Sequence, residues 1–170
     1  MFHRIATSNL VARLPCIVVT GRGFPDIATR RFVQALARQL GLPVLGLADY
    51  NPFGLAILLV YAHGSVSMGH SYHFAVPQLR PLGLFTDDAT GALLAVPAHA
   101  FQAMSATDIA KANALLASPV VAQARPELAR ELRKMLAHGK KLELDSAQAA
   151  LGNVLVDVWL PGAMVRAGCM

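Results

Sequence analysis

The stretch from Val44 to Gly54 constrains this chain more than any other part of its sequence. It begins with an apolar run typical of a buried strand, which is followed by two short polar residues, Asp49 and Asn51, and then by Pro52. Because Pro is favoured as the first residue of a helix, we predict a strand over Val44–Ala48 and a helix over Pro52–His63. In α/β folds, ligands bind beyond the C-terminal ends of parallel strands. The stretch therefore predicts a functional site at a strand end.

Asp49 and Asn51 are the candidate metal ligands in this stretch. A carboxylate at a strand end can hold Mg²⁺, which prefers oxygen ligands and usually takes only one or two of them from protein. Asn51 has a competing interpretation, because Asn is a favoured residue for capping the start of a helix, and both roles can coexist. Capping leaves Asp49 unexplained, so Asp49 is the stronger candidate.

The first half of the chain alternates strand-like and helix-like patterns. Ile17–Thr20 is a β-branched run, and a helix that Asp26 can cap and Gly41 can end follows it. We expect this helix to bury the stripe Ala28, Phe32, Leu36 and Leu40 and to expose Arg30, Gln34 and Arg38. Strand, helix, strand and helix at this spacing predict a parallel sheet flanked by helices.

The second half is mostly helical in pattern. Short strands are expected over Pro77–Leu84 and Ala92–Val96. Helices are expected from Ser105 or Thr107 through Ala117, from Arg125 to Gly139, over Lys141–Leu151 and over Asn153–Leu160. Residues after Pro161 are expected to be loose.

The positive charge is concentrated in the first half. Residues 1–86 carry seven basic and two acidic side chains, a balance of +5, whereas residues 87–170 carry eight of each. An excess of positive charge around the Asp49 segment is expected where a protein faces a polyanion such as DNA. A solvated basic surface explains the charge equally well. The apolar run Phe53–Ala62 is much shorter than the roughly 20 residues of a membrane span, so no membrane partner is expected.

A nucleotide-binding enzyme is the weakest interpretation. Gly21-Arg22-Gly23 follows a strand-like run, but Asp26 stands where the third glycine of a dinucleotide-binding motif is needed. No Gly-Lys-Ser or Gly-Lys-Thr triplet occurs anywhere in the chain.

Several motifs in order resemble the Toprim domain of the topoisomerase VI A subunit and its meiotic double-strand-break relatives. The resemblance covers roughly residues 14–161, and the Gly-Ser-Val-Ser-Met run is most similar to the eukaryotic, meiotic branch. The matching segments are Thr20–Asp26, Ala28–Arg30, Leu47–Gly54, Tyr61, Gly64–Met68, Val76–Pro77, Leu82–Leu84, Leu116–Pro119 and Lys141–Glu143.

This resemblance implies a DNA-cleaving transesterase of the type II topoisomerase class that makes double-strand breaks in meiotic recombination, in the nucleus. Mg²⁺ bound by Toprim carboxylates would position a DNA phosphate for attack by a tyrosine. Asp49 matches the first aspartate of the family's Asp-x-Asp pair, and Arg22 occupies a slot that is basic in the family. Arg30 and Arg31 are further candidate DNA contacts. The implied partners are DNA and either a second copy or a topoisomerase VI B-like subunit.

Three departures from the family pattern weaken this activity. Asn51 replaces the second aspartate, which removes one negative charge and predicts a weakened Mg²⁺ site. The Toprim glutamate belongs on a strand before Phe2–Arg13, and no Glu occurs before Glu127. The nucleophilic tyrosine belongs to an N-terminal winged-helix domain, whereas the tyrosines here lie inside the Toprim region: Tyr50, Tyr61 and Tyr72. No catalytic residue is therefore assigned.

We thus expect a partial Toprim domain over residues 1–161, lacking the first Toprim strand and the winged-helix domain, with a loose tail over 162–170. The favoured function is the DNA-binding part of a double-strand-break protein, inactive as this isolated chain. The alternative is a noncatalytic, degenerate paralogue that serves dimerisation or complex assembly.

Overall fold

The computed structural model describes residues 1–64 and 71–168 and divides into two compact units. The first unit contains Met1–Leu47, Ile57–Leu82 and Val156–Met170. The second contains Ala48–Ala56 and Gly83–Leu155. Most of the Gly64–Met68 run, on which part of the resemblance rests, lies outside the described residues.

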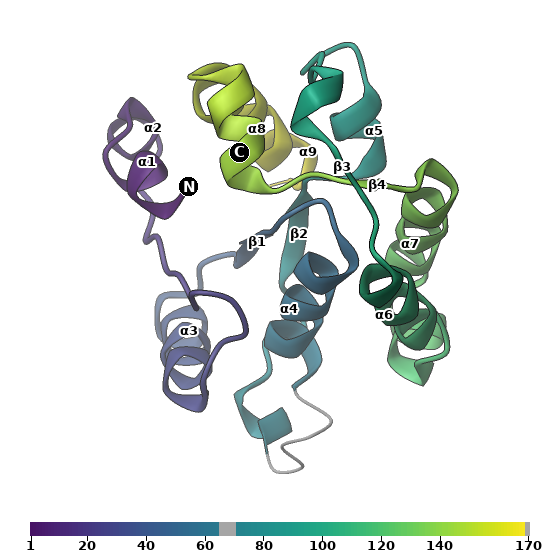
Figure 1. The fold of residues 1–170 in the computed structure, drawn as a ribbon. Coiled ribbons are helices and arrows are strands. Elements are labelled where there is room, and N and C mark those ends of the chain that lie inside the picture. Colours follow the sequence, from purple (N-terminus) through teal and green to yellow (C-terminus); the bar gives the residue numbers. More distant parts are fainter. Residues whose placement is uncertain (65–70, 169–170) are drawn as a thin grey trace. The chain divides into compact units, whose positions relative to one another are not determined.

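The first unit is built around a short parallel sheet (Figure 1). Its strands are β1 (Leu45–Leu47) and β2 (Arg80–Gly83), and the last residue of β2, Gly83, belongs to the second unit. The Arg80 amide donates a hydrogen bond of 2.9 Å to the Val44 carbonyl, which pairs the two strands. The accompanying helices are α1 (Phe2–Ala6), α2 (Asn9–Arg13), α3 (Ile27–Leu40), most of α4 (Pro52–His63), α9 (Leu160–Arg166), a 3₁₀ turn at Ser71–Phe74 and most of a π-helical turn at Leu155–Trp159. This mixed α/β architecture confirms the predicted fold class.

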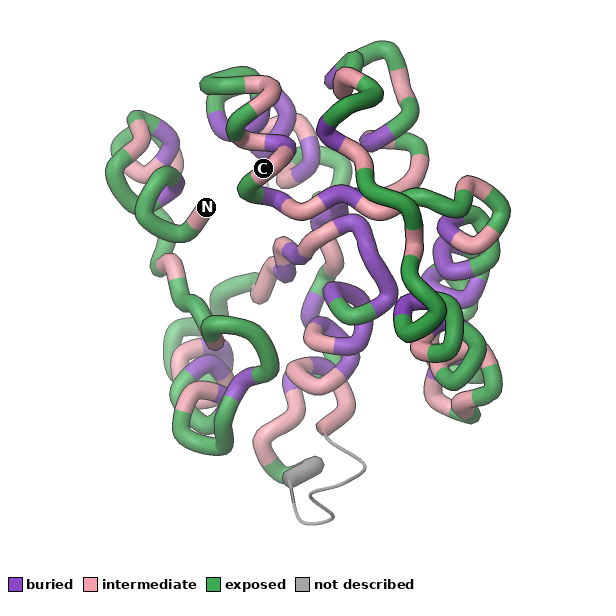
Figure 2. Tube along the Cα trace, viewed as in Figure 1, coloured by how far each residue is buried: buried purple, intermediate pink, exposed green. Residues whose placement is uncertain are grey.

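Helix α4 packs directly on β1, and the contact depends on Gly46. A Cβ atom added at Gly46 would lie 2.6 Å from Leu58 Cδ2 and 3.0 Å from Leu79 Cδ2, closer than packed atoms approach one another. Figure 2 shows buried backbone along much of α4, which begins at Pro52 as predicted. Among the described residues no single helix is long and apolar enough to cross a membrane; the bent pair Leu144–Leu151 and Leu155–Arg166 reaches that length only together.

The boundaries of α3 were predicted correctly, but its buried face was not. The Asp26 carboxylate caps the helix by accepting from the Thr29 amide at 2.7 Å, and Gly41 ends it with φ of 62°. The side chains that α3 buries are Arg30, Val33 and Ala37, whereas Phe32 and Leu40 are about half exposed.

Polar side chains on this face of α3 contact other parts of the first unit. Gln34 Nε2 donates to the carbonyls of His73 and Ala75 at 2.6 and 3.0 Å, and Arg30 lies beside Tyr61. Burial lowers the pKa of the Arg30 guanidinium, because the charged form is poorly solvated there. A periodicity argument alone does not detect these contacts between α3 and the rest of the first unit.

Three other sequence expectations are wrong. Ile17–Thr20 is irregular and exposed, since no described strand pairs with it. Ala92–Val96 forms an irregular turn in which the Ala95 amide donates to the Gly91 carbonyl at 3.2 Å. Residues 162–166 are not loose, because α9 continues to Arg166 and buries Ala163.

The second unit is mainly helical and has a small antiparallel sheet. Strands β3 (Gln102–Ala103) and β4 (Lys140–Lys141) pair with Gln102 opposite Lys141. The helices are the start of α4, α5 (Thr86–Thr90), α6 (Ala106–Leu116), α7 (Pro126–His138) and α8 (Leu144–Leu151), with a 3₁₀ turn at Ala98–Ala100 and a π-helical turn at Val120–Ala124. The core is formed by side chains of α6 and α7 with their neighbours: Ala112, Val121, Leu128, Leu132 and Met135.

Asp108 ties helix α6 to strand β4. Its carboxylate accepts from the Ser105 amide at 2.8 Å and from Lys141 Nζ at 2.9 Å, and its side chain is only 3% exposed. Burial alone would raise the pKa of Asp108, but the hydrogen bonds from Ser105 and Lys141 outweigh burial and hold the pKa below the usual value. The predicted Ser105 cap is confirmed, and it forms one half of a capping box with Asp108.

Replacing Asp108 by Ala should destabilise the chain by about 2–4 kcal/mol, because Lys141 and the α6 cap both lose a buried partner. A lowered folded-state pKa stabilises the protein above the unfolded carboxyl value of about 3.9 and is lost as the pH falls below it. The variant should therefore lose less stability than the parent on acidification from pH 4 to about pH 2. Urea unfolding at several pH values measures both effects.

Asp87→Ala is the matched control, because Asp87 pairs with Lys134 in an exposed ion pair and should change stability little. Equal losses for the two variants would contradict this account of Asp108.

Candidate metal site

An antiparallel bridge between Tyr50 and Leu142 organises the candidate site. The Tyr50 amide donates to the Leu142 carbonyl at 2.9 Å, and the Leu142 amide donates back to the Tyr50 carbonyl at 3.0 Å. Both side chains are completely buried. Because side chains alternate across an extended chain, the neighbours of Tyr50 and Leu142 emerge on the opposite face. The bridge thus places Asp49 across from Glu143.

Asp49 lies just beyond the C-terminal end of β1, as predicted. Strand pairing extends to Ala48, whose amide donates to the Gly83 carbonyl at 3.0 Å. Asp49 Oδ1 accepts from the Leu144 amide at 2.7 Å, at the first residue of α8. One carboxylate oxygen therefore has a structural role, and Asp49 links the strand end to the start of a distant helix.

Asn51 caps helix α4. Its Oδ1 accepts from the Gly54 amide at 2.7 Å, and its Nδ2 lies 3.5 Å from Glu143 Oε1. Asn51 is 6% exposed. The capping interpretation is confirmed, and the amide turns its nitrogen, not its oxygen, toward Glu143. A metal-ligand role for Asn51 remains a prediction.

Glu143 was not among the sequence-predicted site residues. It lies between β4 and α8, and its carboxyl group is hydrogen-bonded to that of Asp49. Burial, followed by the charge of Asp49, raises the pKa of Glu143. The tripeptide Lys141-Leu142-Glu143 was noted only as part of a resemblance, and nothing in its spacing from Asp49 indicates proximity. Only the Tyr50–Leu142 pairing reveals it.

The Tyr50 side chain enters a polar network behind this site. Its hydroxyl lies 3.1 Å from His138 Nδ1 and 3.3 Å from Thr86 Oγ1. The amide and hydroxyl of Thr86 both donate to Glu131. Burial, with the nearby Lys140 charge, lowers the pKa of His138, so the ring is neutral at pH 7. The network fixes the backbone that carries Asp49 and Asn51.

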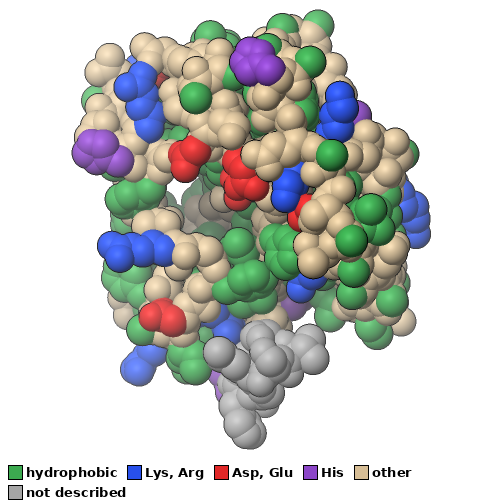
Figure 3. Space-filling view, viewed as in Figure 1, with side chains coloured by type: hydrophobic (Ala, Val, Ile, Leu, Met, Phe, Trp, Pro, Cys, Tyr) green, Lys and Arg blue, Asp and Glu red, His purple; other side chains and the backbone are tan. Residues whose placement is uncertain are grey.

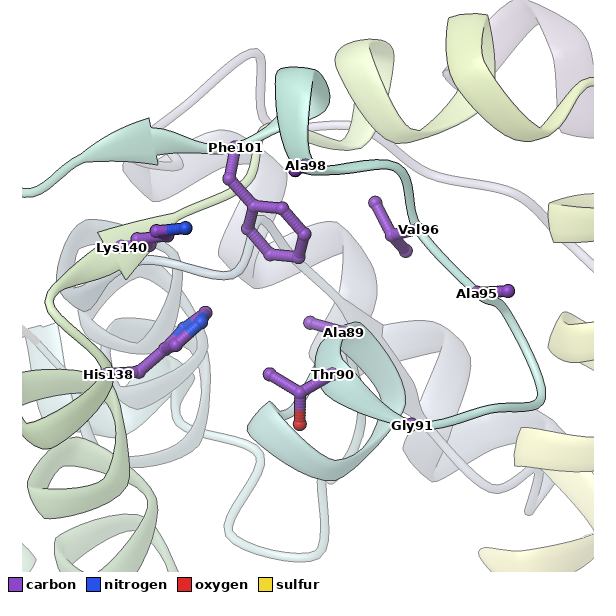
Figure 4. A pocket seen from close by; sticks show the side chains of 9 residues that line it. All are labelled: Ala89, Thr90, Gly91, Ala95, Val96, Ala98, Phe101, His138 and Lys140. Atoms are coloured by element: carbon purple, nitrogen blue, oxygen red, sulfur yellow. The ribbon is translucent and has the colours of Figure 1, made fainter.

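Beside this network lies a pocket of about 230 Å³ (Figure 4). His138, Lys140 and Phe101 line one side, and the segment from Ala89 to Ala98 lines the other. Phe101 contacts His138 edge-on, with ring centroids 5.5 Å apart. The pocket lies on the Tyr50 side of the bridge and does not include the two carboxylates.

The three arginines predicted to contact DNA differ in exposure. Arg22 and Arg31 are exposed. Arg30 is fully buried, so its guanidinium is not presented at the surface of the first unit. A role in DNA binding remains a prediction for all three, and only Arg22 and Arg31 have the exposure that phosphate contact requires.

Comparisons with known proteins identify the family. Residues 1–164 match the family model that describes the Toprim domain of Spo11 and of the topoisomerase 6 A subunit. The chain belongs to this family. It is 37% identical over 162 residues to meiotic recombination protein SPO11-1 of Oryza sativa subsp. indica, covering 95% of this chain and 42% of the relative.

Two further relatives belong to the same family. Meiotic recombination protein SPO11 of Mus musculus is 32% identical over 165 residues, covering 96% of this chain and 41% of the relative. The A subunit of DNA topoisomerase 6 from Arabidopsis thaliana is 33% identical over 161 residues, covering 94% and 37%. The chain therefore spans less than half the length of the curated relatives it matches.

Toprim domains generally bind Mg²⁺, and the donors here fit that ion. Two carboxylates, Asp49 and Glu143, meet at the end of a strand, and hard oxygen ligands of this kind are what Mg²⁺ prefers. Within the described residues no three His, Cys, Asp or Glu side chains gather into a metal-binding group. The candidate site thus contains two carboxylates, with Asn51 beside them.

Gly54 provides a test of how tightly this site is packed. A Cβ atom at Gly54 would lie 2.4 Å from the Asp49 carbonyl oxygen and 3.1 Å from the Asp49 amide nitrogen. Gly54→Ala should therefore displace the Asp49 backbone and destabilise the chain by about 1–3 kcal/mol in urea unfolding.

Gly162→Ala is the control, because the added methyl group meets only Arg166 Nη1 at 3.5 Å and Ala favours a helix over Gly by roughly 1 kcal/mol. An unchanged unfolding midpoint for Gly54→Ala would show that Asp49 is not held as closely as described.

Proposed function

We propose that this chain is the DNA-binding Toprim part of a protein that forms double-strand breaks in meiotic recombination, acting in the nucleus on chromosomal DNA. Relatives named as meiotic recombination proteins support this function. The observation that carries it is the Asp49–Glu143 carboxylate pair at the end of β1, in a family whose Toprim domains bind Mg²⁺. The excess positive charge of residues 1–86 is the expected counterpart for a DNA backbone.

Asp49 and its neighbours would hold Mg²⁺ in this proposal. When bound, the ion offsets negative charge on the phosphate oxygens of DNA. Asn51, in place of a second aspartate, adds no negative charge, so affinity should be weaker than for a site with both aspartates. The capping bond to Gly54 and the bond from Leu144 to Asp49 hold these side chains in place without the ion.

The isolated chain is proposed to bind DNA without cleaving it. Tyr50 is fully buried and engaged with Thr86 and His138, and burial raises its pKa. Burial likewise raises the pKa of Tyr61, whose hydroxyl lies where a side chain at Gly21 would have to fit. Neither phenol is presented as a nucleophile. Cleavage would need a tyrosine from elsewhere, and a second copy or a topoisomerase VI B-like subunit would complete the assembly.

Asp49→Asn should weaken Mg²⁺ binding at least about tenfold, since it removes a full ligand charge while keeping the shape of the side chain. Asn51→Asp should strengthen binding, because Asp adds a charge and still caps α4. Calorimetric titration of the full chain with MgCl₂ measures both. Identical titrations for the parent and the two variants would refute the site.

Replacing Arg22 and Arg31 together by Ala should weaken the binding of duplex DNA about equally for all DNA sequences. The slope of the logarithm of the binding constant against the logarithm of the salt concentration should become shallower by about one for each phosphate that is no longer bound. Fluorescence anisotropy at several salt concentrations measures the slope. Arg133→Ala with Arg130→Ala, exposed on α7, is the charge-matched control. Unchanged affinity in the Arg22 and Arg31 variant would rule out these contacts, and a covalent DNA adduct of the parent chain would overturn the proposed lack of cleavage.

A second candidate function is assembly without catalysis, and one observation favours it. Hydrophobic side chains are visible on the surface drawn in Figure 3. In the first unit Phe24, Ile27, Phe32 and Leu40 are 51%, 46%, 53% and 52% exposed. Where such side chains form a contiguous patch, they mark a surface on which proteins associate. The magnesium titration separates the two functions, because a pure assembly module would show no Asp49-dependent response.

A further inference from the structure

We propose that Glu143 is the second cation ligand of this chain and supplies the charge that Asn51 does not. The inference rests on the proposed function, because it assigns a further ligand to the same site. It differs from the sequence-based prediction, which placed both ligands in the segment Asp49–Asn51.

Backbone register brings Glu143 to the site. The two hydrogen bonds between Tyr50 and Leu142, at 2.9 and 3.0 Å, set Asp49 opposite Glu143. Tyr50 and Leu142 are 0% exposed on one face of the pair, so Asp49 and Glu143 emerge together on the other. The Leu144 amide then donates to Asp49 Oδ1 at 2.7 Å, which fixes the position of the residue next to Glu143.

Asn51 acts in this arrangement as a positioning residue. Its oxygen accepts from the Gly54 amide, so its amide nitrogen is the group that faces Glu143 Oε1, at 3.5 Å. An amide nitrogen can donate to a carboxylate but cannot ligate Mg²⁺. The ligand charge therefore comes from Asp49 and Glu143, which approach from two segments about ninety residues apart in sequence.

The neighbouring cation is hydrogen-bonded to a different carboxylate, although its charge still acts on Glu143. Lys141 precedes Glu143 by two residues, but its ammonium group donates to Asp108 Oδ2 at 2.9 Å. Asp108 is 3% exposed in its side chain and also receives the Ser105 amide and hydroxyl, so the Lys141 ammonium is held at the end of α6. Two adjacent carboxylates with this lysine engaged elsewhere fit a divalent cation.

The test is a titration of the full chain with Mn²⁺. Binding is measured as the loss of the electron paramagnetic resonance signal of free Mn²⁺, and added Mg²⁺ should compete for the same site. Glu143→Gln should raise the Mn²⁺ dissociation constant at least about tenfold, as Asp49→Asn should. Asp145→Asn, an exposed acid two residues further on, removes the same charge and should change the constant less than about twofold. The double variant Asn51→Asp with Glu143→Gln should recover affinity, because the introduced aspartate supplies the carboxylate that Glu143→Gln removes.

The outcomes separate the two claims. The inference is supported if Asp49→Asn and Glu143→Gln both lose Mn²⁺ binding and the double variant Asn51→Asp with Glu143→Gln recovers it. Recovery in the double variant also shows that the loss in Glu143→Gln is not caused by unfolding. Loss in Asp49→Asn with parental affinity in Glu143→Gln overturns the role of Glu143 and leaves the proposed function standing. Parental affinity in both variants overturns the two together.

Discussion

The backbone pairing of Tyr50 with Leu142 is the interaction on which the candidate site depends. Two hydrogen bonds join segments that are far apart in sequence, and both side chains are completely buried. Buried backbone groups must be paired, and a slip of one residue would turn the buried faces outward, so the register is strongly fixed. Through that register, a core requirement determines which carboxylates meet on the other face of the strand pair.

The second determinant of the candidate site is the ion pair formed by its neighbouring lysine. Lys141 lies on the strand that leads to Glu143, and a free ammonium group there would compete with any metal ion for the carboxylates. Asp108 binds this ammonium instead and caps α6 at the same time. One buried aspartate thus stabilises the second unit and holds the Lys141 ammonium group, whose charge acts on Glu143 without a direct bond. In the proposed cation site, Asp108 would therefore influence binding without being a ligand.

The sequence predicted the local parts of this arrangement and missed the long-range ones. The Asp26, Asn51 and Ser105 caps and the start of α4 at Pro52 follow from nearest neighbours, and the structure confirms each. The buried face of α3 was wrong, because Arg30 and Gln34 find partners outside the helix that apolar periodicity cannot indicate. Glu143 was missed for the same reason: its proximity to Asp49 arises from strand register, which no local pattern encodes.

The proposed ligands and the proposed DNA contacts belong to different units of the chain. Asp49, Asn51 and Glu143 all lie in the second unit, whereas Arg22 and Arg31 lie in the first. The proposed cation site therefore uses contacts internal to one unit, and the proposed DNA contacts are exposed side chains of the other. The replacement of an aspartate by Asn51 would lower the affinity of the proposed site for a cation in the second unit and would leave the arginines of the first unit unchanged.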